Sequence, residues 1–461
     1  MPLLCYKAMF KRQILSDLKE WSERAGRKPL ILRGARQVGK TTAIELFSKN
    51  FDHFIELNLE HPEERKIFQQ YRPFSEVLDA IFYYKEQEKN KGNILIFIDE
   101  IQNSPHAVNL LRYFYEQAPE IHVIAAGSLL ETLIHRKASF PVGRVEYLGV
   151  YPCTFNEYLT ALEDAQSRDM LARFPFPEFA HDKMMKQFRD YTLVGGMPEV
   201  VASFASNRDL VSLSRIYESL ILTYLDDVEK YARNDSMTKV IRHIIRASFD
   251  YASSRIKFAG FGNSSYKSRE VGEAFEVLQK AMLLQLIYPT TNLQHPVREN
   301  IRKSPRLQLL DTGMVNYFSE MQKKLFGSEQ IDDVYGGRIA EHIVGQELRA
   351  VNKSLLKNIM FWTREEKHAD AKVDFIWKYD DYIIPIEVKS GKSGKLRSLH
   401  QFMDRADHQF AIRVTSGILK SEIVKSAGGK EFYLLNLPFY LVHKLETYLS
   451  AFTQTPDTFL R

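Results

Sequence analysis

Cysteine is scarce in this sequence, and long hydrophobic runs are missing. Of 461 residues only Cys5 and Cys153 are cysteines, which is too few for a disulfide framework or for a zinc site built on cysteine. No apolar run approaches the ~20 residues that cross a bilayer. The first residues mix Cys, Tyr and Lys instead of forming an apolar signal segment. We therefore expect a cytoplasmic protein that does not enter a membrane.

A strong overall charge is also absent. The net charge is +5 and hydrophobic residues make up 44% of the chain. A chain of this length can bury several cores, and we expect about two to four domains. The charge is uneven, however, because eleven Lys or Arg stand against five Asp or Glu between Arg242 and Arg306. That segment is a candidate basic surface.

Four short runs in the first third of the sequence have the pattern of strands, at residues 29–32, 53–59, 94–98 and 121–125. The segments between them carry apolar positions at helical spacing. Continuous apolar runs such as 94–98 are typical of strands buried on both faces of a parallel sheet. The alternation predicts a doubly wound α/β domain, with functional groups at the carboxyl ends of the strands.

A glycine-rich loop follows the first of these runs and fits the pattern G-x4-G-K-[ST]. It consists of Gly34, Ala35, Arg36, Gln37, Val38, Gly39, Lys40, Thr41 and Thr42. Backbone N–H groups of such a loop surround a polyphosphate, Lys40 reaches its β and γ phosphates, and the Thr41 hydroxyl ligates magnesium. A chance glycine turn is the alternative, but the flanking strand and helix match the mechanism. The loop predicts ATP and Mg²⁺ as cofactors.

An acidic pair, Asp99 and Glu100, comes directly after the run 94–98. Asp99 is suited to hold magnesium and Glu100 to polarise the attacking water. The pair could instead only cap the next helix. Given the upstream loop, we interpret it as the hydrolytic half of an ATPase site.

Two further residues are weaker catalytic candidates. Ser128 follows the run 121–125, where its hydroxyl could contact the γ-phosphate or the water. Arg144 follows Gly143 in a loop and could reach a phosphate of its own subunit or of a neighbouring one. A lone arginine is otherwise usually a solvated surface group.

These motifs, in this order and spacing, resemble a family of AAA-superfamily ATPases of bacteria and archaea that carry a C-terminal domain of uncharacterised function. The resemblance continues at residues 151–157, at Gly195-Gly196 and at Asp311-Thr312-Gly313, so it covers nearly the whole chain. It implies that Ser128 is a sensor and Arg144 an arginine finger. The helical pattern that follows the ATPase core is similar to the small helical lid of AAA proteins.

The basic segment has the element order of a winged helix. A helix, a turn with two glycines and a second helix precede short apolar segments near Ile287 and Leu307. Candidates for sequence-independent phosphate contacts are Lys267, Arg269, Arg302, Lys303 and Arg306. The alternative is a winged helix that serves only as a packing module.

The C-terminal part contains carboxylates and a lysine at nuclease-like positions. Asp374 lies in a strand-like segment, and Glu387 and Lys389 lie in its predicted hairpin partner, while Glu341 lies near the start of a helix. Side chains two residues apart on a strand share a face, and grouped carboxylates suit magnesium or manganese. A bound cation and Lys389 could then activate water and stabilise charge on a phosphodiester.

This pattern resembles the PD-(D/E)XK nuclease superfamily. Asp374, Glu387 and Lys389 fall on its signature and Glu341 on its first-helix acid, although Val373 stands where the signature has proline. An active nuclease, a nuclease fold that binds without cutting, and a coincidental pattern all stay open.

The sequence thus predicts an α/β multidomain protein with four parts. These are a P-loop AAA-type parallel-sheet ATPase core (1–155), a helical lid (156–235), a winged helix (236–325) and a C-terminal restriction-endonuclease-like α/β domain (326–461). We expect ATP hydrolysis coupled to nucleic-acid engagement or cleavage. The alternative is an ATP-dependent switch that binds a protein partner or DNA through an inactive nuclease-like domain. DNA, a protein and further copies of the chain stay open as partners.

Overall fold

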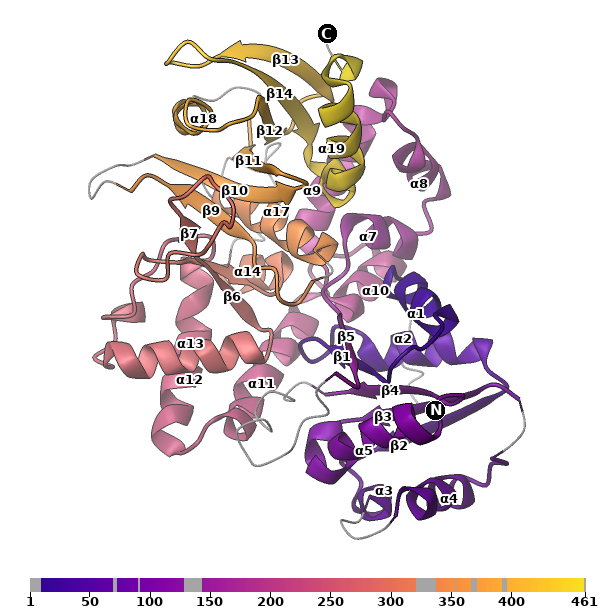
Figure 1. Ribbon diagram of the computed structural model, residues 1–461. Coiled ribbons are helices and arrows are strands. Elements are labelled where there is room, and N and C mark those ends of the chain that lie inside the picture. The colour runs from indigo at the N-terminus through magenta and orange to yellow at the C-terminus, as the bar shows by residue number, and fades with distance from the viewer. Residues whose placement is uncertain are drawn as a thin grey trace. The chain divides into compact units, whose positions relative to one another are not determined.

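The computed structural model describes residues 10–68, 73–89, 92–127, 143–320, 337–352, 354–365, 371–391 and 396–459 (Figure 1). The chain forms two compact units. The first contains the residues up to Tyr151 and the short segment Lys280–Leu283, and the second contains most of the remaining chain. In the described ranges no helix is long and apolar enough to cross a membrane.

The first unit is built on a five-stranded sheet in the order β2-β3-β4-β1-β5. Every neighbouring pair is parallel. The strands are β1 (Leu30–Arg33), β2 (His53–Asn58), β3 (Ile94–Asp99), β4 (His122–Ala126) and β5 (Glu146–Gly149). This confirms the predicted parallel-sheet α/β core.

Helices cover both faces of this sheet. They are α1 (Ile14–Glu23), α2 (Lys40–Phe47), α3 (Pro62–Ile67), α4 (Phe74–Tyr84) and α5 (Pro105–Gln117). Figure 1 shows α3, α4 and α5 on one side, where Leu78 and Phe114 pack with the alternate β3 residues Ile96 and Ile98. The intervening Phe97 is also fully buried, so the continuous apolar run reflects a strand covered on both faces.

The second unit begins with a helical region, as the pattern predicted. It contains α7 (Phe155–Ala161), α8 (Ala165–Ala172), α9 (His181–Val194), α10 (Pro198–Asn207) and α11 (Ser214–Tyr231). Thr154 and Glu157 start α7 with a reciprocal capping box, which satisfies two backbone donors at the helix start.

The next segment has the order helix, helix, hairpin. Its elements are α12 (Asp235–Ser248), α13 (Ser268–Lys280), the antiparallel strands β6 (Leu284–Ile287) and β8 (Arg306–Leu309), and α14 (Thr312–Phe318). This order agrees with the expected one, and the assignment as a winged helix stays a prediction. One predicted phosphate contact is wrong, because Arg306 is only 1% exposed and pairs with Glu341 inside the protein.

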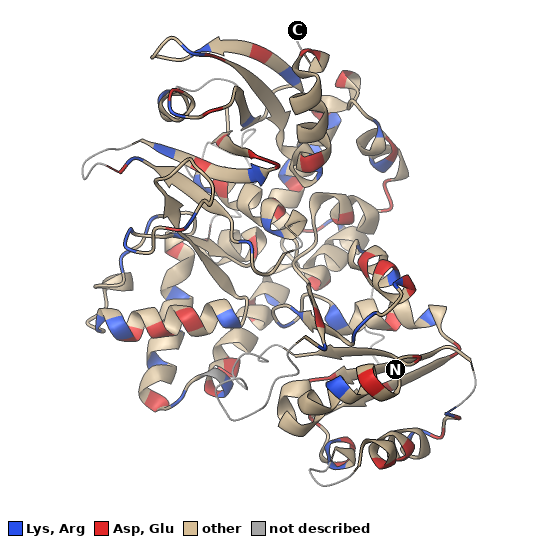
Figure 2. Cartoon of the chain, in the orientation of Figure 1, with Lys and Arg blue, Asp and Glu red and all other residues tan. Residues whose placement is uncertain are grey.

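Charges on α13 do not form a basic face. The helix carries three glutamates against Arg269 and Lys280, and Figure 2 shows the two signs interspersed along it. A helix that enters a DNA groove is instead expected to be basic. The basic excess read from the sequence is therefore spread over several elements.

A seven-stranded mixed sheet, in the order β13-β14-β12-β11-β10-β9-β7, forms the C-terminal part. Its strands are β7 (Pro289–Thr290), β9 (Met360–Thr363), β10 (Lys372–Tyr379), β11 (Tyr382–Lys389), β12 (Phe410–Thr415), β13 (Lys420–Lys425) and β14 (Glu431–Pro438). The helices are α17 (Arg338–Val351), α18 (Arg397–Met403) and α19 (Leu445–Gln454). As predicted, β10 and β11 form an antiparallel hairpin, whereas β11, β12 and β14 run parallel.

One face of this sheet changes from apolar to polar along its strands. Leu399 and Phe402 of α18 pack on an apolar area that includes Ile383 and Leu434. Beyond it the cross-strand neighbours Glu387, Arg413, Asn436 and Lys420 follow one another from β11 to β13. We call these four residues the polar row.

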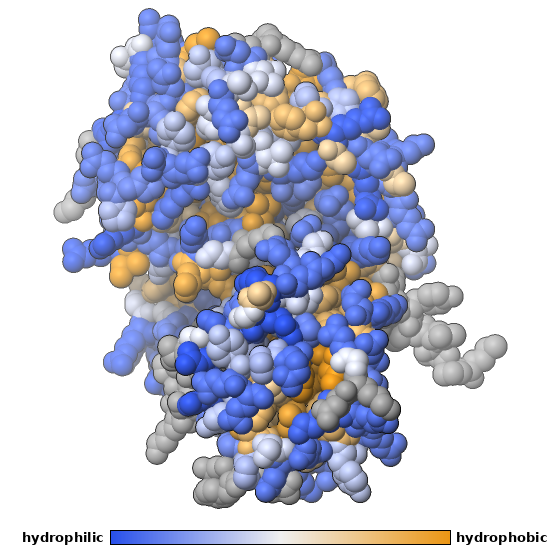
Figure 3. Space-filling model, turned by 45° about the vertical axis from the view of Figure 1, so that its right-hand side comes forward, coloured by the Kyte–Doolittle hydropathy of each residue, from blue (hydrophilic) through white to orange (hydrophobic). Residues whose placement is uncertain are grey.

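The surface visible in Figure 3 is mostly hydrophilic, with apolar side chains in small groups. Exposed apolar residues include Tyr83 and Leu356. Scattered exposed apolar residues are normal in folded proteins, and we infer no interface from them.

Candidate nucleotide site and nuclease-like site

The glycine-rich loop links the end of β1 to the start of α2, and two glycines make its path possible. Gly39 precedes the helix with φ of 89°, a conformation that favours glycine. A Cβ on Gly34 would lie 2.5 Å from the backbone oxygen of Val150. The close packing of this loop therefore depends on both positions.

Lys40 is folded into the loop. Its Nζ donates to the backbone oxygens of Gly34 at 2.9 Å and Ala35 at 2.8 Å. Burial lowers the pKa of Lys40 to about 8, although Glu100 and Asp99 act in the opposite direction. A polyphosphate would supply the negative charge that this buried ammonium lacks.

Thr41 and Asp99 meet beside Lys40. The Thr41 hydroxyl donates to Oδ2 of Asp99 at 3.1 Å, and the backbone N–H of Glu100 donates to Oδ1 of Asp99 at 2.9 Å. A hydroxyl and a carboxylate are the oxygen ligands that Mg²⁺ prefers. These two side chains fit the predicted magnesium that accompanies ATP.

Glu100 follows β3 in a left-handed backbone conformation, with φ of 49°. Its carboxylate accepts a hydrogen bond from Gln102 and lies 3.8 Å from the guanidinium of Arg36 in the loop. Burial raises the pKa of Glu100 above its usual range. A strained backbone and a perturbed acid beside a phosphate loop are typical of a functional site.

Arg144 does not contact the loop residues named above. Its Nε donates to Oε1 of Glu116 on α5 at 2.9 Å, and about half of its side chain is exposed. The arginine-finger role therefore stays a prediction. The sensor candidate Ser128 lies outside the described residues.

The nuclease-like residues are brought together in the second unit. Asp374 on β10 accepts a hydrogen bond from the backbone N–H of Val388 at 2.9 Å. On β11 the ammonium of Lys389 lies 2.7 Å from Oε1 of Glu387. Asp374 and Glu387 are both about 5% exposed. Glu341 approaches from α17 and joins the group through a lysine that the sequence analysis did not single out.

That lysine is Lys372, and it bridges two of the predicted metal ligands. Its Nζ lies 2.9 Å from Oε2 of Glu341 and 3.0 Å from Oδ1 of Asp374. The spacing could have revealed it, because Lys372 is two residues before Asp374 and period two places both on one face.

The second residue that sequence reasoning missed is Arg306. Its guanidinium lies 3.0 Å from Oε2 of Glu341 and 4.2 Å from the ring centre of Phe375. Nothing in the local sequence indicates this pairing, because β8 and α17 are distant along the chain. Arg306 thus belongs to the interior of the nuclease-like site.

Three carboxylates and three cations therefore meet at this site. Burial raises the pKa of Glu387 to about 7, with Asp374 adding to the shift. Burial alone would lower the pKa of Lys389, but the carboxylates of Glu387, Asp374 and Glu341 together outweigh it and raise that pKa. The cationic nitrogens are in direct contact with the carboxylate oxygens.

This arrangement differs from the predicted metal site of Glu341, Asp374 and Glu387. In the ranges that the structure describes, no group of three or more His, Cys, Asp or Glu side chains is placed to hold a metal ion. Lys372 occupies the position between Glu341 and Asp374 that a bridging cation would take. These residues, as arranged, do not fit a divalent metal.

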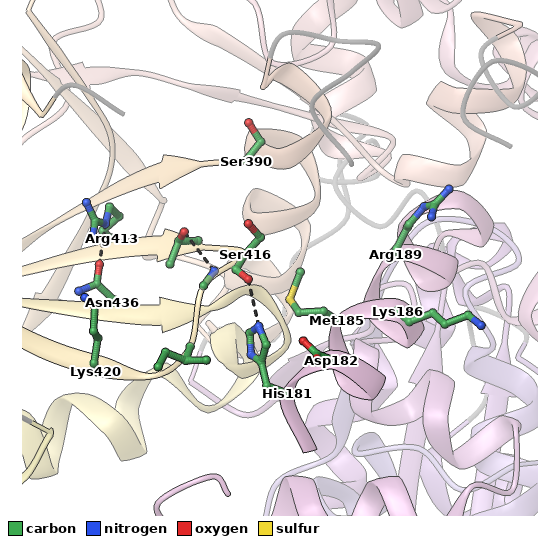
Figure 4. Close-up of a pocket in the computed structure, with 13 residues that line it drawn as sticks. His181, Asp182, Met185, Lys186, Arg189, Ser390, Arg413, Ser416, Lys420 and Asn436 are labelled. Atoms are coloured by element: carbon green, nitrogen blue, oxygen red, sulfur yellow. Dashed lines mark hydrogen bonds between the residues drawn. The ribbon is translucent and has the colours of Figure 1, made fainter. Parts of the chain in front are cut away.

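A pocket of about 860 Å³ lies beside this site in the same unit. Its lining comes from α9, from the ends of β11 and β12, and from β13 and β14, as Figure 4 shows. The polar row connects the two, since Glu387 is the cross-strand neighbour of Arg413.

Two glycine motifs from the sequence have a structural role in a buried polar cluster. Gly196 N–H donates to Oδ2 of Asp311 at 2.5 Å, and a Cβ on Gly195 would lie 2.4 Å from the same carboxylate. Gln346 and Glu347 of α17 join the cluster through Tyr191. Burial raises the pKa of Asp311 to about 6 and that of Glu347 to about 7.

Comparison with protein families matches three successive parts of the chain. A family described as an AAA domain matches residues 26–159. Two domains of unknown function, DUF8612 and DUF4143, match residues 185–325 and 336–440. No curated protein matches the chain.

Several solved structures are distantly similar. The Walker-type ATPase PABY2304 of Pyrococcus abyssi is 15% identical, with 67% of this chain and 96% of that chain covered and a TM-score of 0.42. The Aeropyrum pernix Orc1 protein in complex with DNA is 15% identical (66% and 91% covered, TM-score 0.28). The Thermotoga maritima RuvB Holliday junction branch migration motor is also 15% identical (64% and 93% covered, TM-score 0.27). We base no functional argument on likenesses this low.

Proposed function

We propose that this chain, which carries an AAA-type P-loop ATPase core, hydrolyses ATP and uses its nucleotide state to control the binding of nucleic acid by its C-terminal nuclease-like domain. In this proposal the domain binds a nucleic-acid strand and does not cut it. The observation that carries the proposal is the position of Lys372 between Glu341 and Asp374.

The ATPase half of the proposal rests on the loop geometry. Lys40 would bind the phosphates, Thr41 and Asp99 would hold the magnesium that neutralises them, and Glu100 would orient the attacking water. Glu100 is engaged by Gln102 and lies near Arg36, so it must exchange these partners before it can act. Arg144 would supply a finger from a neighbouring subunit.

The second half of the proposal is an argument from charge. A metal-dependent nuclease needs carboxylate oxygens that are open to a divalent cation. Here Lys372, Lys389 and Arg306 already pair with the three carboxylates, and among their oxygens Oε2 of Glu387 is buried without a hydrogen-bond partner in the described part of the chain. Arg306 is 1% exposed and cannot move into solvent without breaking the local packing. Adding two further positive charges to this buried group would be unfavourable.

The second candidate function is a metal-dependent nuclease. This candidate is favoured because the signature residues Asp374, Glu387 and Lys389 lie close together. In that case Lys372 would have to swing away from Glu341 and Asp374 before a metal could bind.

The deciding experiment measures binding and cleavage on the same samples. Linear, circular and single-stranded DNA are incubated with Mg²⁺ or Mn²⁺, with and without ATP, beside Glu387→Ala and Lys389→Ala. We expect binding that depends on ATP and no cutting. Cutting by the wild type that both substitutions abolish would establish the nuclease, and an absence of DNA binding would reject both candidates.

The finger assignment has its own test. Lys40→Ala and Arg144→Ala proteins, each inactive alone, are mixed and assayed for ATP turnover. Recovery of activity is expected because a mixed assembly can contain one site with both residues intact. No recovery, from proteins shown to assemble, would contradict a finger supplied by a neighbour.

A further inference from the structure

We propose that the pocket between α9 and the carboxyl ends of β11 and β12 binds the phosphate backbone of a nucleic-acid strand. This inference rests on the function proposed above and deepens it, because it names the surface on which the strand lies. The pocket, and not α13, would be the main nucleic-acid contact of the second unit.

The lining of the pocket is strongly basic. Four Lys or Arg stand against a single acid, Asp182; the four are Lys186, Arg189, Arg413 and Lys420. Figure 4 shows Arg413 and Lys420 on the strand side and Lys186 and Arg189 on the helix side, extended away from the strands. The lining also includes Ser390, Thr415 and Ser416, which carry hydroxyl groups, and the apolar Met185 and Ile418. Cations and hydroxyls are the groups that contact phosphate oxygens.

The polar row links the pocket to the nuclease-like site. From Glu387 the polar row passes through Arg413 and Asn436 to Lys420. Three strand spacings of ~4.8 Å make this path about 14 Å long. At a rise of ~3.4 Å per nucleotide it can contact more than one phosphate. A nucleic-acid strand bound in the pocket would therefore run towards Lys389.

Hydrogen bonds hold the walls of the pocket in place. His181, at the start of α9, lies 3.1 Å from the backbone oxygen of Ser416 and 2.9 Å from the hydroxyl of Tyr440. Arg413 donates to Asn436 at 2.5 Å and to Glu422 at 3.0 Å. Glu422 cancels part of the charge of Arg413 and lies 3.5 Å from the ammonium of Lys420, while the guanidinium stays fixed. A preformed surface loses little entropy when it binds.

The lining residues are suited to contacting phosphate groups and not to stacking on bases. No Phe, Tyr or Trp is among the residues that line the described pocket. Proteins that hold unpaired bases stack them on aromatic rings. The one imidazole in the lining, His181, is held by Ser416 and Tyr440, so the pocket is suited to the backbone of a nucleic-acid strand, without base specificity.

The test is a double substitution, Lys186→Gln with Lys420→Gln, in the full chain. With ATP and Mg²⁺ present, binding of a fluorescent 20-nucleotide single strand is followed by anisotropy over a range of salt concentrations. We expect about tenfold weaker binding and a salt slope smaller by about one for each lysine removed. Lys425→Gln, at the other end of β13, is the matched control and should bind like the wild type. The charge-preserving pair Lys186→Arg with Lys420→Arg should bind normally, because the contact depends on the positive charges, and the glutamine pair should melt at the wild-type temperature.

Each outcome decides the inference. If the double variant binds as tightly as the wild type, the strand lies elsewhere and the pocket proposal is overturned while the proposed function stands. If the wild type does not bind the strand at all, the proposed function itself fails. If millimolar adenosine monophosphate displaces the strand completely, the pocket is a mononucleotide site and the backbone proposal is rejected. Weak competition by the mononucleotide, with the expected salt slope, supports it.

Discussion

The nucleotide site and the nuclease-like site use the same residue types in opposite ways. Both place carboxylates near the ends of strands beside lysines. At the nucleotide site Lys40 donates to neutral backbone oxygens, and Asp99 accepts from the neutral hydroxyl of Thr41. At the nuclease-like site Lys372 and Lys389 lie directly on carboxylates.

The two lysine pKa values express the difference. Burial lowers the pKa of Lys40 to about 8, whereas Glu387 raises the pKa of Lys389. The first lysine gains from an added anion, and the second already has one. The comparison teaches that the chemistry of a site follows from how its charges are paired, and not from which residues are present.

The largest effect is expected from Lys40→Ala. Removing the buried ammonium should abolish ATP binding and reduce turnover by at least ~10²-fold. Nucleotide binding is measured by calorimetry and turnover by phosphate release. ATP binding at wild-type affinity would remove the contrast between the two sites, since Lys40 would then be a structural lysine too.

Glu100→Gln should separate binding from turnover. The amide keeps the size of the side chain but cannot polarise water, so ATP should bind while turnover falls by roughly 10²-fold or more. Gln102→Ala is the companion variant, which removes the hydrogen bond to Glu100 and leaves the carboxylate. Hydrolysis by Glu100→Gln at the wild-type rate would show that another group activates the water.

Lys372→Ala should destabilise the second unit and open it to metal. Glu341 and Asp374 lose their shared partner, at a cost of about 2 kcal/mol in the free energy of unfolding, less than for a fully buried pair because Lys372 is partly exposed. Mn²⁺ should then raise the melting temperature of the variant but not that of the wild type or of Lys425→Ala. Equal stabilisation of all three proteins would contradict the closed-site interpretation.

The buried cluster on α17 predicts a smaller, pH-dependent effect. Burial raises the pKa of Glu347 to about 7, while an unfolded glutamate titrates near ~4.3. A raised carboxyl pKa means that the folded state binds the proton more tightly, so the stability that this group contributes is complete below about pH 4 and is lost as the pH rises to about 7. Glu347→Gln should flatten this loss, as measured by urea unfolding at pH 5 and pH 7.5. An unchanged pH dependence would mean that Glu347 is ionised in the folded protein.

Sequence patterns predicted the features of the molecule that depend on interactions between residues close together in the chain. The glycine loop depends on backbone conformation over a few residues, and the shared face of Glu387 and Lys389 follows from the period of a strand. The run before Asp99 predicted a buried parallel strand for the same reason. Each of these signals lies within about ten residues.

Local sequence patterns could not predict which charged side chains pair with one another. Arg306 was expected at the surface as one of the cations of the basic segment, yet the hairpin of β6 and β8 brings it under Glu341 and beside Phe375. The pocket likewise joins α9 to β12, which are more than two hundred residues apart in the sequence. Local periodicity contains no information on such contacts.

In the buried cluster, His342 fixes which groups donate and which accept hydrogen bonds. Nε2 of His342 accepts from the backbone N–H of Leu309 at 3.2 Å, so the ring proton must lie on Nδ1, which then donates to the Thr312 hydroxyl at 2.7 Å. That hydroxyl donates a hydrogen bond to Oε1 of Gln346, and the amide nitrogen of Gln346 donates to Asp311. The tautomer of His342 and the backbone N–H of Thr312, which also donates to Oε1 of Gln346, thus favour the same amide orientation one turn further along α17.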